Sequence, residues 1–126
     1  MFKILIVDDD DDFQELSRIT VRRSGLPVKM MEATNGQQAL DLLSSGSFTP
    51  DLVLLDINMP RMGGYEFLEA YSSHIEAKCP VVMLTGSDCA AERYKAMAYP
   101  FVKEFFEKPL SVDNIIELTE LVDQLS

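Results

Sequence analysis

The chain of 126 residues lacks any long hydrophobic run. No apolar stretch approaches the ~20 residues of a membrane span or carries the flanks of a signal peptide, so we expect a cytoplasmic protein without a membrane anchor. Internal repeats and linker-like stretches of Pro, Gly or Ser are also absent. The length suits one domain, residues 1–126, with a single central sheet covered by helices on both faces.

Basic residues are scarce: 11 Lys and Arg oppose 21 Asp and Glu, which gives a net charge of −10. Affinity for a phosphate backbone comes from Lys and Arg displacing counterions, so we expect no direct nucleic-acid binding by this domain. Cys79 and Cys89 lack a CxxC spacing and are interpreted as reduced, partly buried thiols. The single histidine, His74, follows Tyr71-Ser72-Ser73 near the end of a predicted helix and is interpreted as a solvated side chain.

What the chain does contain is a set of apolar runs that end in polar side chains. The runs are Ile4–Val7 before Asp8 and Asp9, Leu52–Leu55 before Asp56, Val81–Leu84 before Thr85, and the weaker Glu104–Glu107 before Lys108 and Pro109. Continuous apolar runs are typical of strands buried on both faces, and helix-like segments lie between them. With a short strand over about 28–33, the pattern predicts five parallel strands that alternate with five helices.

Glycine, proline and N-capping residues define the ends of the predicted helices. The first helix stops at Gly25-Leu26-Pro27, the second opens at Asn35-Gly36, the third follows the loop 59–64, the fourth runs from Gly86-Ser87-Asp88 to about Tyr99, and the last has Ser111 as N-cap and reaches about Leu125. Helical spacing predicts apolar positions at Phe13, Leu16, Ile19 and Thr20 in the first helix, and at Phe67, Leu68 and Tyr71 in the third.

Polar residues that follow parallel strands share one edge of the sheet, where ligands bind. Asp8 and Asp9 would face Asp56 there, and like charges at that distance raise one another's pKa unless a cation neutralises them. Carboxylates and carbonyl oxygens suit Mg²⁺, which also keeps open positions for other oxygen ligands. Residues 10–12, also aspartates, fall in the first turn of a helix, where they complement the helix dipole, and no chemistry is assigned to them.

Lys108 and Thr85 complete a set that suits a phosphoryl group. An ammonium at the same edge would hold a phosphoryl group as a point charge, and the Thr85 hydroxyl would bind another phosphoryl oxygen. Phosphoryl transfer needs little beyond positioning and charge neutralisation, which leaves Asp56 as the nucleophile.

Over essentially its whole length the chain resembles the receiver domain of two-component response regulators. The motifs are Val7-Asp8-Asp9, the run Leu55-Asp56-Ile57-Asn58-Met59-Pro60-Arg61-Met62-Gly63-Gly64, Leu84-Thr85-Gly86, and Phe106-Glu107-Lys108-Pro109. The resemblance implies a doubly wound parallel α/β sheet of order 2-1-3-4-5 with helices on both faces.

The resemblance also implies the roles of individual residues. Asp56 would take a phosphoryl group from a histidine kinase or histidine phosphotransfer protein. Asp9, Asp56 and the backbone carbonyl of Asn58 would ligate Mg²⁺, with Asp8 acting through a metal-bound water. Thr85 and Lys108 would bind the phosphoryl oxygens.

By the same resemblance, the aromatic ring of Phe105 would respond to Thr85 and switch a surface around the fourth helix, fifth strand and last helix for a downstream protein target. The chain would then be a phosphoacceptor signalling domain rather than an enzyme. Phe105 lacks a hydroxyl, so its switching would rest on packing, and the alternative is a simple core residue. Phe101-Val102 replaces the usual Gly-Ala pair, which leaves the loop at 98–103 undefined.

Two other functions compete with this one. A hydrolase of the haloacid-dehalogenase type also combines an aspartate nucleophile, Mg²⁺, Thr and Lys, but it carries a further acidic pair after the lysine that this chain lacks. An interaction module without a switch is the second alternative, and the complete set of site residues opposes it. The sequence leaves open whether the protein is a single-domain regulator or continues past Ser126.

The last helix is acidic, with Asp113, Glu117, Glu120 and Asp123 and no basic residue. Leu118, Leu121 and Leu125 form a second apolar stripe beside Ile115 and Val122. One hypothesis is that a basic, partly apolar partner or an additional segment covers this stripe. The alternative is a solvated helix whose second stripe belongs to the periphery of the core.

Overall fold

A computed structural model of the chain describes residues 2–46, 49–57, 64–74, 79–85 and 97–125. Its centre is a five-stranded sheet in which every pair of neighbouring strands is parallel. The order is β2-β1-β3-β4-β5, as expected. The strands are β1 (Phe2–Val7), β2 (Val28–Ala33), β3 (Leu52–Asp56), β4 (Val81–Thr85) and β5 (Val102–Glu107).

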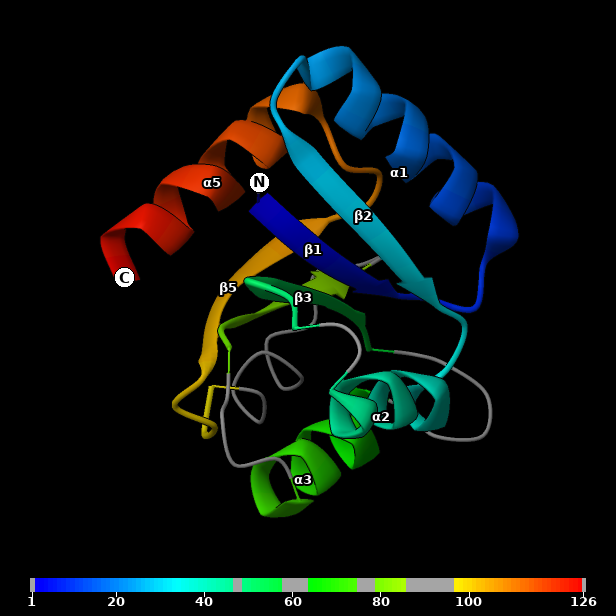
Figure 1. Ribbon diagram of the computed structural model, residues 1–126, viewed down its shortest axis with the longest axis vertical. Helices are drawn as coiled ribbons and strands as arrows, with labels where there is room; N and C mark the ends of the chain where they lie inside the picture. Colours follow the sequence, from blue (N-terminus) through cyan, green and yellow to red (C-terminus); the bar gives the residue numbers. More distant parts are fainter. Residues whose placement is uncertain (1, 47–48, 58–63, 75–78, 86–96, 126) are drawn as a thin grey trace.

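Two helical layers enclose the sheet (Figure 1). The helices α1 (Asp11–Ser24) and α5 (Val112–Leu125) cover one face, while α2 (Gly36–Ser45) and α3 (Gly64–His74) cover the other. The predicted fourth helix falls mostly on 86–96, outside the described residues. Its expected end is described: residues 97–101 form turns, so the helix does not extend to Tyr99. None of the helices that the structure describes combines the length and apolar character of a membrane span.

Capping residues define the helix ends, and those at Gly25, Asn35 and Ser111 were predicted from the sequence. Asp10 is the N-cap of α1, and its side chain accepts hydrogen bonds from the backbone N–H groups of Asp12 and Phe13. Asn35 caps α2 in the same way. The Ser111 hydroxyl accepts from the Asn114 N–H at 3.1 Å, as predicted for the last helix. Gly25 ends α1 with φ of 70°, a left-handed conformation that glycine adopts at low cost.

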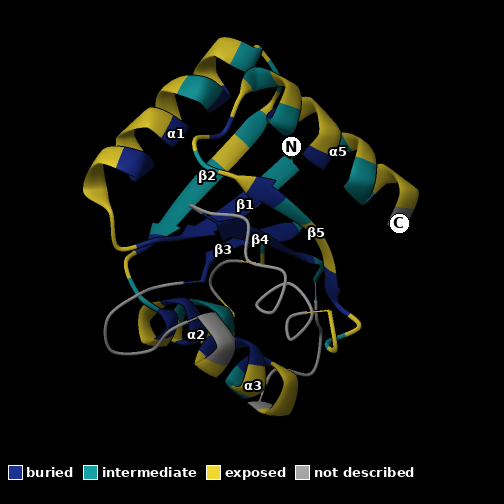
Figure 2. Ribbon diagram, turned by 180° about the vertical axis from the view of Figure 1, so that it is seen from behind, coloured by how far each residue is buried: buried dark blue, intermediate teal, exposed yellow. Residues whose placement is uncertain are grey.

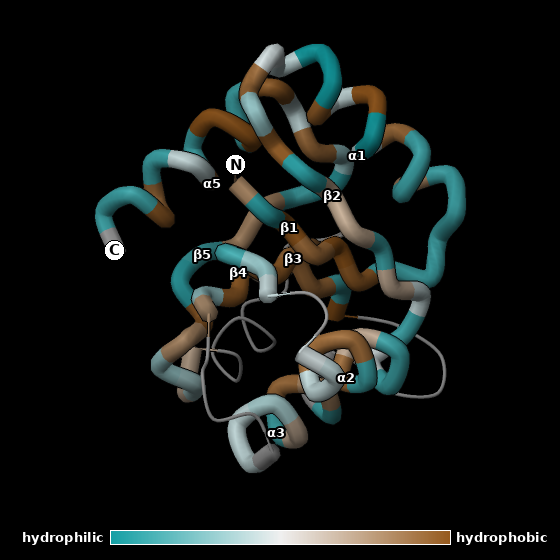
Figure 3. Tube along the Cα trace, viewed as in Figure 1, coloured by the Kyte–Doolittle hydropathy of each residue, from teal (hydrophilic) through white to brown (hydrophobic). Residues whose placement is uncertain are grey.

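The central strands are buried on both faces, as their continuous apolar sequences predict. All residues of β3 and β4 are buried, and so are the last four of β1 (Figure 2). Colouring by hydropathy shows the same concentration of apolar residues at the sheet centre (Figure 3). Successive side chains along the central strands alternate between two hydrophobic cores, one under α2 and α3 and one under α1 and α5.

The buried face of α1 agrees with the predicted one at Phe13 but differs from it at Leu16 and Ile19. Leu16 and Ile19 are 51% and 41% exposed, whereas the buried residues are Phe13, Gln14, Ser17 and Val21. The reason is that two polar side chains find partners inside. The Gln14 amide donates to backbone carbonyls, and the Ser17 hydroxyl donates to the Phe13 carbonyl at 2.8 Å. Burial of hydrogen-bonded polar groups costs little, so hydrophobic spacing alone misidentified this face.

The second apolar stripe of α5 belongs to the core. Leu118 is fully buried, and Leu121 and Val122 pack against the cluster under α1 and α5. The described part of the stripe therefore packs on the core, as in the peripheral-core alternative, and Leu121 is half-buried at its edge.

Tyr71 organises the core beneath α3. Its ring stacks on Phe67 with centroids 5.5 Å apart and meets Phe101 edge-on at 5.0 Å. Its hydroxyl accepts from the backbone N–H of Cys79 at 2.8 Å, and burial raises the pKa of Tyr71 above its ordinary value.

Phe101 and Val102 are both buried, so they enter the core in place of the smaller pair expected there. Cys79 is a free, half-buried thiol, while Cys89 lies outside the described residues.

Replacing Tyr71 by Phe should therefore destabilise the protein by about 1–3 kcal/mol, because the Cys79 N–H loses its acceptor inside a partly buried site. Urea unfolding of the two proteins measures this difference. Tyr99→Phe is the matched control, since the Tyr99 hydroxyl bonds to Glu69 at an exposed site. We expect the control to change stability by less than about 0.5 kcal/mol. Equal losses in the two variants would contradict the role given to the buried hydroxyl.

Candidate functional site

The carboxyl ends of four strands bring the predicted site residues to one edge of the sheet. Asp8 follows β1, Asp56 and Thr85 are the last residues of β3 and β4, and Lys108 follows β5. Asp8, Asp56 and Thr85 are 0%, 6% and 4% exposed, although each is polar. The backbone N–H of Lys108 donates to the Thr85 carbonyl at 3.0 Å, which ties the ends of the last two strands together.

Asp8, Asp9 and Asp56 form an acidic cluster. Each residue offers a carboxylate oxygen, and these oxygens lie within 4.8 Å of one another. Asp8 and Asp56 are buried, whereas Asp9 is exposed. Three oxygen donors this close fit a hard divalent cation such as Mg²⁺, because the cation would relieve their mutual repulsion. Asn58, whose carbonyl the sequence resemblance adds to this set, lies outside the described residues.

Lys108 supplies a positive charge inside the cluster. Its Nζ lies 2.6 Å from Asp8 Oδ2 and 3.3 Å from Asp56 Oδ1. The same atom stands 4.7 Å from the centre of the Phe13 ring, a cation–π distance. Burial alone lowers the pKa of Lys108, but the hydrogen bond to Asp8 and the charges of Asp56 and Asp8 outweigh it and raise the pKa. The lysine is therefore a charged part of the site and not a surface residue.

Gln14 holds the backbone beneath the acidic cluster, a role that the sequence reading missed. Its Nε2 donates towards the carbonyls of Ile6, Asp8 and Ala33 at 3.1–3.3 Å, and the residue is 3% exposed. These contacts join the ends of β1 and β2 to the first turn of α1. No local sequence pattern marks Gln14, because its partners lie on β1 and β2.

The remaining predicted residues have simpler placements. Asp11 and Asp12 lie in the first turn of α1, as expected, whereas Asp10 precedes the helix as its N-cap. Asp10 also donates its backbone N–H to Asp8 Oδ1 at 2.9 Å and so orients a cluster carboxylate. Phe105 is half-buried on β5 and packs against the core under α2 and α3.

Comparison with known proteins identifies the family. The model of the response regulator receiver domain matches residues 4–120. The chain belongs to this family. As a receiver domain of two-component systems, it is similar to the response regulator MprA of Mycolicibacterium vanbaalenii, with 32% identity over 114 residues that cover 90% of this chain and 47% of MprA. The regulatory protein AtoC of Escherichia coli is 32% identical over 98% of this chain and 25% of AtoC.

Solved structures support the same assignment. A two component response regulator from Cytophaga hutchinsonii superposes with a TM-score of 0.87 at 27% identity, and 98% of each chain is covered. A CheY-like receiver domain protein from Methanospirillum hungatei gives 0.75 at 29% identity over 97% of each chain. The chain spans about half or less of the length of the two curated relatives named above. The family match favours the receiver over the hydrolase considered from the sequence.

Because Lys108 forms two ion pairs in this receiver site, the loss of stability in Lys108→Met should depend on pH. At pH 8 in metal-free buffer, the variant should be about 1–3 kcal/mol less stable, because Asp8 keeps a buried charge without its partner. A raised lysine pKa stabilises the fold below the unfolded value of ~10.4, and this contribution is lost as pH rises through the folded pKa. Urea unfolding from pH 8 to 11 should show the difference shrinking. A constant difference, or an equal one for the exposed Lys103→Met control, would contradict the ion-pair model.

Proposed function

We propose that this receiver domain accepts a phosphoryl group from a phosphohistidine donor onto Asp56. The observation that carries the proposal is the approach of Lys108 Nζ to Asp56 Oδ1, 3.3 Å, at a sheet edge where Thr85 also ends a strand. Asp56 is the natural acceptor because Asp8 makes the shorter ion pair with Lys108 and Asp9 is exposed.

The proposed transfer uses the side chains in distinct ways. A carboxylate oxygen of Asp56 forms the new P–O bond while the P–N bond of the donor breaks, and the donor imidazole leaves with the bonding electrons. Lys108 stabilises the charge that develops on the phosphoryl oxygens, and the Thr85 hydroxyl donates a hydrogen bond to one of them. This assigns the domain to signalling, as a phosphoacceptor that assists its own phosphorylation and dephosphorylation.

Mg²⁺ is the proposed cofactor, held by carboxylates of Asp9 and Asp56 and by the carbonyl of Asn58, with Asp8 acting through a metal-bound water. When bound, it would supply charge neutralisation to the phosphoryl oxygens. The support is the oxygen-only composition of the described cluster and the excess of negative charge that one lysine leaves there. Asp8 and Asp56 are buried, so few waters compete for the inner side of the site.

Asp56→Asn should abolish phosphorylation by acetyl phosphate in the presence of Mg²⁺, because an amide oxygen is a poor nucleophile. The wild-type protein should gain one hydroxylamine-sensitive acyl phosphate, detected as a mass increase. Asp10→Asn is the matched control: it removes a neighbouring carboxylate but keeps a good N-cap for α1, so labelling should persist. Equal labelling of Asp56→Asn and wild type would exclude Asp56 as the acceptor.

The proposed donor is a histidine kinase or a histidine phosphotransfer protein. One of the matching relatives, from Helicobacter pylori, is named sensor histidine kinase CheAY, and the match covers 13% of it. In this chain, Leu16 and Ile19 leave apolar surface exposed on α1, which starts beside the acidic cluster. That surface suits a partner that must bring a phosphohistidine to Asp56. We propose that residues 1–126 act as one receiver unit in this transfer, in the cytoplasm.

Thr85 and Phe105 are the proposed switch. The two residues lie on neighbouring strands, with Met83 beside Phe105 and Thr85 beside Glu107. Movement of the Thr85 hydroxyl towards a phosphoryl group would change the packing available to the half-buried Phe105 ring. The response would reach the surface of β5 and α5 and the region of the fourth predicted helix, which lies outside the described residues.

The Thr85→Ala variant should still accept a phosphoryl group on Asp56. The structural response at Phe105 should be weaker, because the remaining methyl group cannot form a hydrogen bond to the phosphoryl oxygen. Amide NMR spectra recorded before and after acetyl phosphate treatment should show smaller shifts at Phe105 and along α5 than in the wild type. Thr34→Ala, at an exposed position beside α2, serves as the control and should respond like the wild type. Undiminished shifts at Phe105 in Thr85→Ala would refute the coupling.

The proposed downstream partner is a protein with a basic surface. A groove of about 160 Å³ runs between β5 and α5, and its lining combines three glutamates with two apolar residues: Glu104, Glu117, Glu120, Phe106, Leu121 and also Gln124. A Lys or Arg side chain entering this groove would gain both ion pairs and contact for its alkyl stem. Because the rim is exposed, association should weaken as salt increases.

A further inference from the structure

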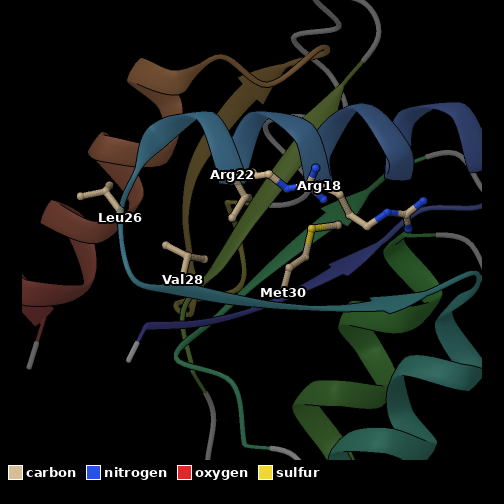
Figure 4. Close-up of a pocket in the computed structure, with 6 residues that line it drawn as sticks. Arg18, Arg22, Leu26, Val28 and Met30 are labelled. Carbon is tan, nitrogen blue, oxygen red and sulfur yellow. The ribbon is translucent and has the colours of Figure 1, made fainter.

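A second groove lies between α1 and β2, on the opposite flank of the sheet from β5. Its volume is about 320 Å³, and its lining is Arg18, Val21, Arg22, Leu26, Val28 and Met30. Figure 4 shows Val28 and Met30 rising from β2 towards α1, with Arg18 and Arg22 on the helix beside the same space. The groove therefore has an apolar floor and a basic rim.

The floor is open because β2 is the edge strand of the sheet. Met30 lies beside Ile4 of β1, and both contribute to the core under α1 and α5. Ile4 is fully buried there, whereas Met30, Val28 and Leu26 are each only half-buried. The difference arises because β2 is an edge strand: no described strand pairs with its outer edge, and these side chains are only partly covered.

The rim is a concentration of positive charge in an acidic protein. Arg18, Arg22 and Arg23 lie within the second half of α1, although the chain carries a net charge of −10. Arg18 forms an ion pair with Glu32 of β2. Arg22 is exposed, and among the described residues it has no ion-pair partner. A guanidinium beside apolar surface is suited to a carboxylate carried by an apolar segment.

We propose that the α1–β2 groove docks a segment of a partner protein that carries Asp or Glu beside apolar side chains. The carboxylate pairs with the Arg22 guanidinium, and the apolar side chains cover Val28 and Met30. Nucleic acid fits the groove poorly: its lining has no aromatic residue on which a base could stack, and Asp11 and Asp12 begin the same helix.

This docking site is separate from the acidic cluster. Val28 begins β2 and lies beside Phe2 at the start of β1, whereas Asp8 follows the other end of β1. A partner seated here leaves the acidic cluster uncovered, so a small phosphodonor such as acetyl phosphate can still reach Asp56. The proposal therefore does not rest on the phosphoryl transfer proposed above.

A random peptide display library selected on the whole protein provides the test. Selected peptides that combine Asp or Glu with apolar residues are expected, and amide shifts in NMR titrations should map them to Val28, Met30 and the second half of α1. Arg22→Glu should weaken their binding about tenfold or more, since it replaces the carboxylate's partner by a like charge. Arg23→Glu makes the same charge change in the same last turn without lining the groove, and should weaken binding less than about threefold at ~0.15 M salt.

Several results would overturn the proposal. These are a selection that yields no acidic–apolar peptides, peptide shifts that map away from α1 and β2, equal effects of Arg22→Glu and Arg23→Glu, and Arg22-dependent binding of a DNA oligonucleotide in place of the peptides. Acetyl phosphate labelling of Arg22→Glu is measured in parallel and should match the wild type. Loss of labelling only in this variant would contradict the separation of the two sites, while loss in the wild type would count against the proposed function alone.

Discussion

The placement of one ammonium group between two buried carboxylates is the constraint on which the site depends. Asp8 is fully buried and Asp56 nearly so, and both would be unstable as neighbouring anions without Lys108. The arrangement exists only if β1, β3 and β5 end at the same edge with a fixed register. The order of the sheet, the Gln14 contacts beneath Asp8 and the backbone bond from Lys108 to Thr85 all maintain that condition.

Sequence reasoning succeeded where burial and chain direction were both fixed. Runs such as Ile4–Val7 are typical of strands buried on both faces of a parallel sheet, and the residues that follow such strands meet at one edge. It failed on α1 because the burial of Gln14 depends on carbonyls from β1 and β2, which no local pattern contains. Phe101 is similar: its place depends on the Tyr71 ring, distant in sequence. Partners remote along the chain decided each of these cases.

The two flanks of the sheet carry opposite charge. At the β5 edge, glutamates of β5 and α5 surround Phe106 and Leu121, whereas at the β2 edge arginines of α1 stand over Val28 and Met30. Both edges leave apolar side chains partly open because a sheet of five strands ends there. Grooves with rims of opposite charge would select different partners, so a basic protein and an acidic one would not compete for the same surface.

Charge balance also explains why a proposed phosphoryl group would act beyond its own site. Three carboxylates and one lysine already leave the cluster negative, and a phosphoryl group on Asp56 would add roughly one further negative charge. Lys108 cannot serve Asp8 and the phosphoryl oxygens equally, so its ion pairs must be redistributed. The backbone N–H of Lys108 donates to the Thr85 carbonyl, and Thr85 lies beside Glu107 of β5, so the proposed switch would connect this redistribution to the strand that carries Phe105. In the proposed switch, the charge added at the site would thus be followed by a packing change at the neighbouring surface.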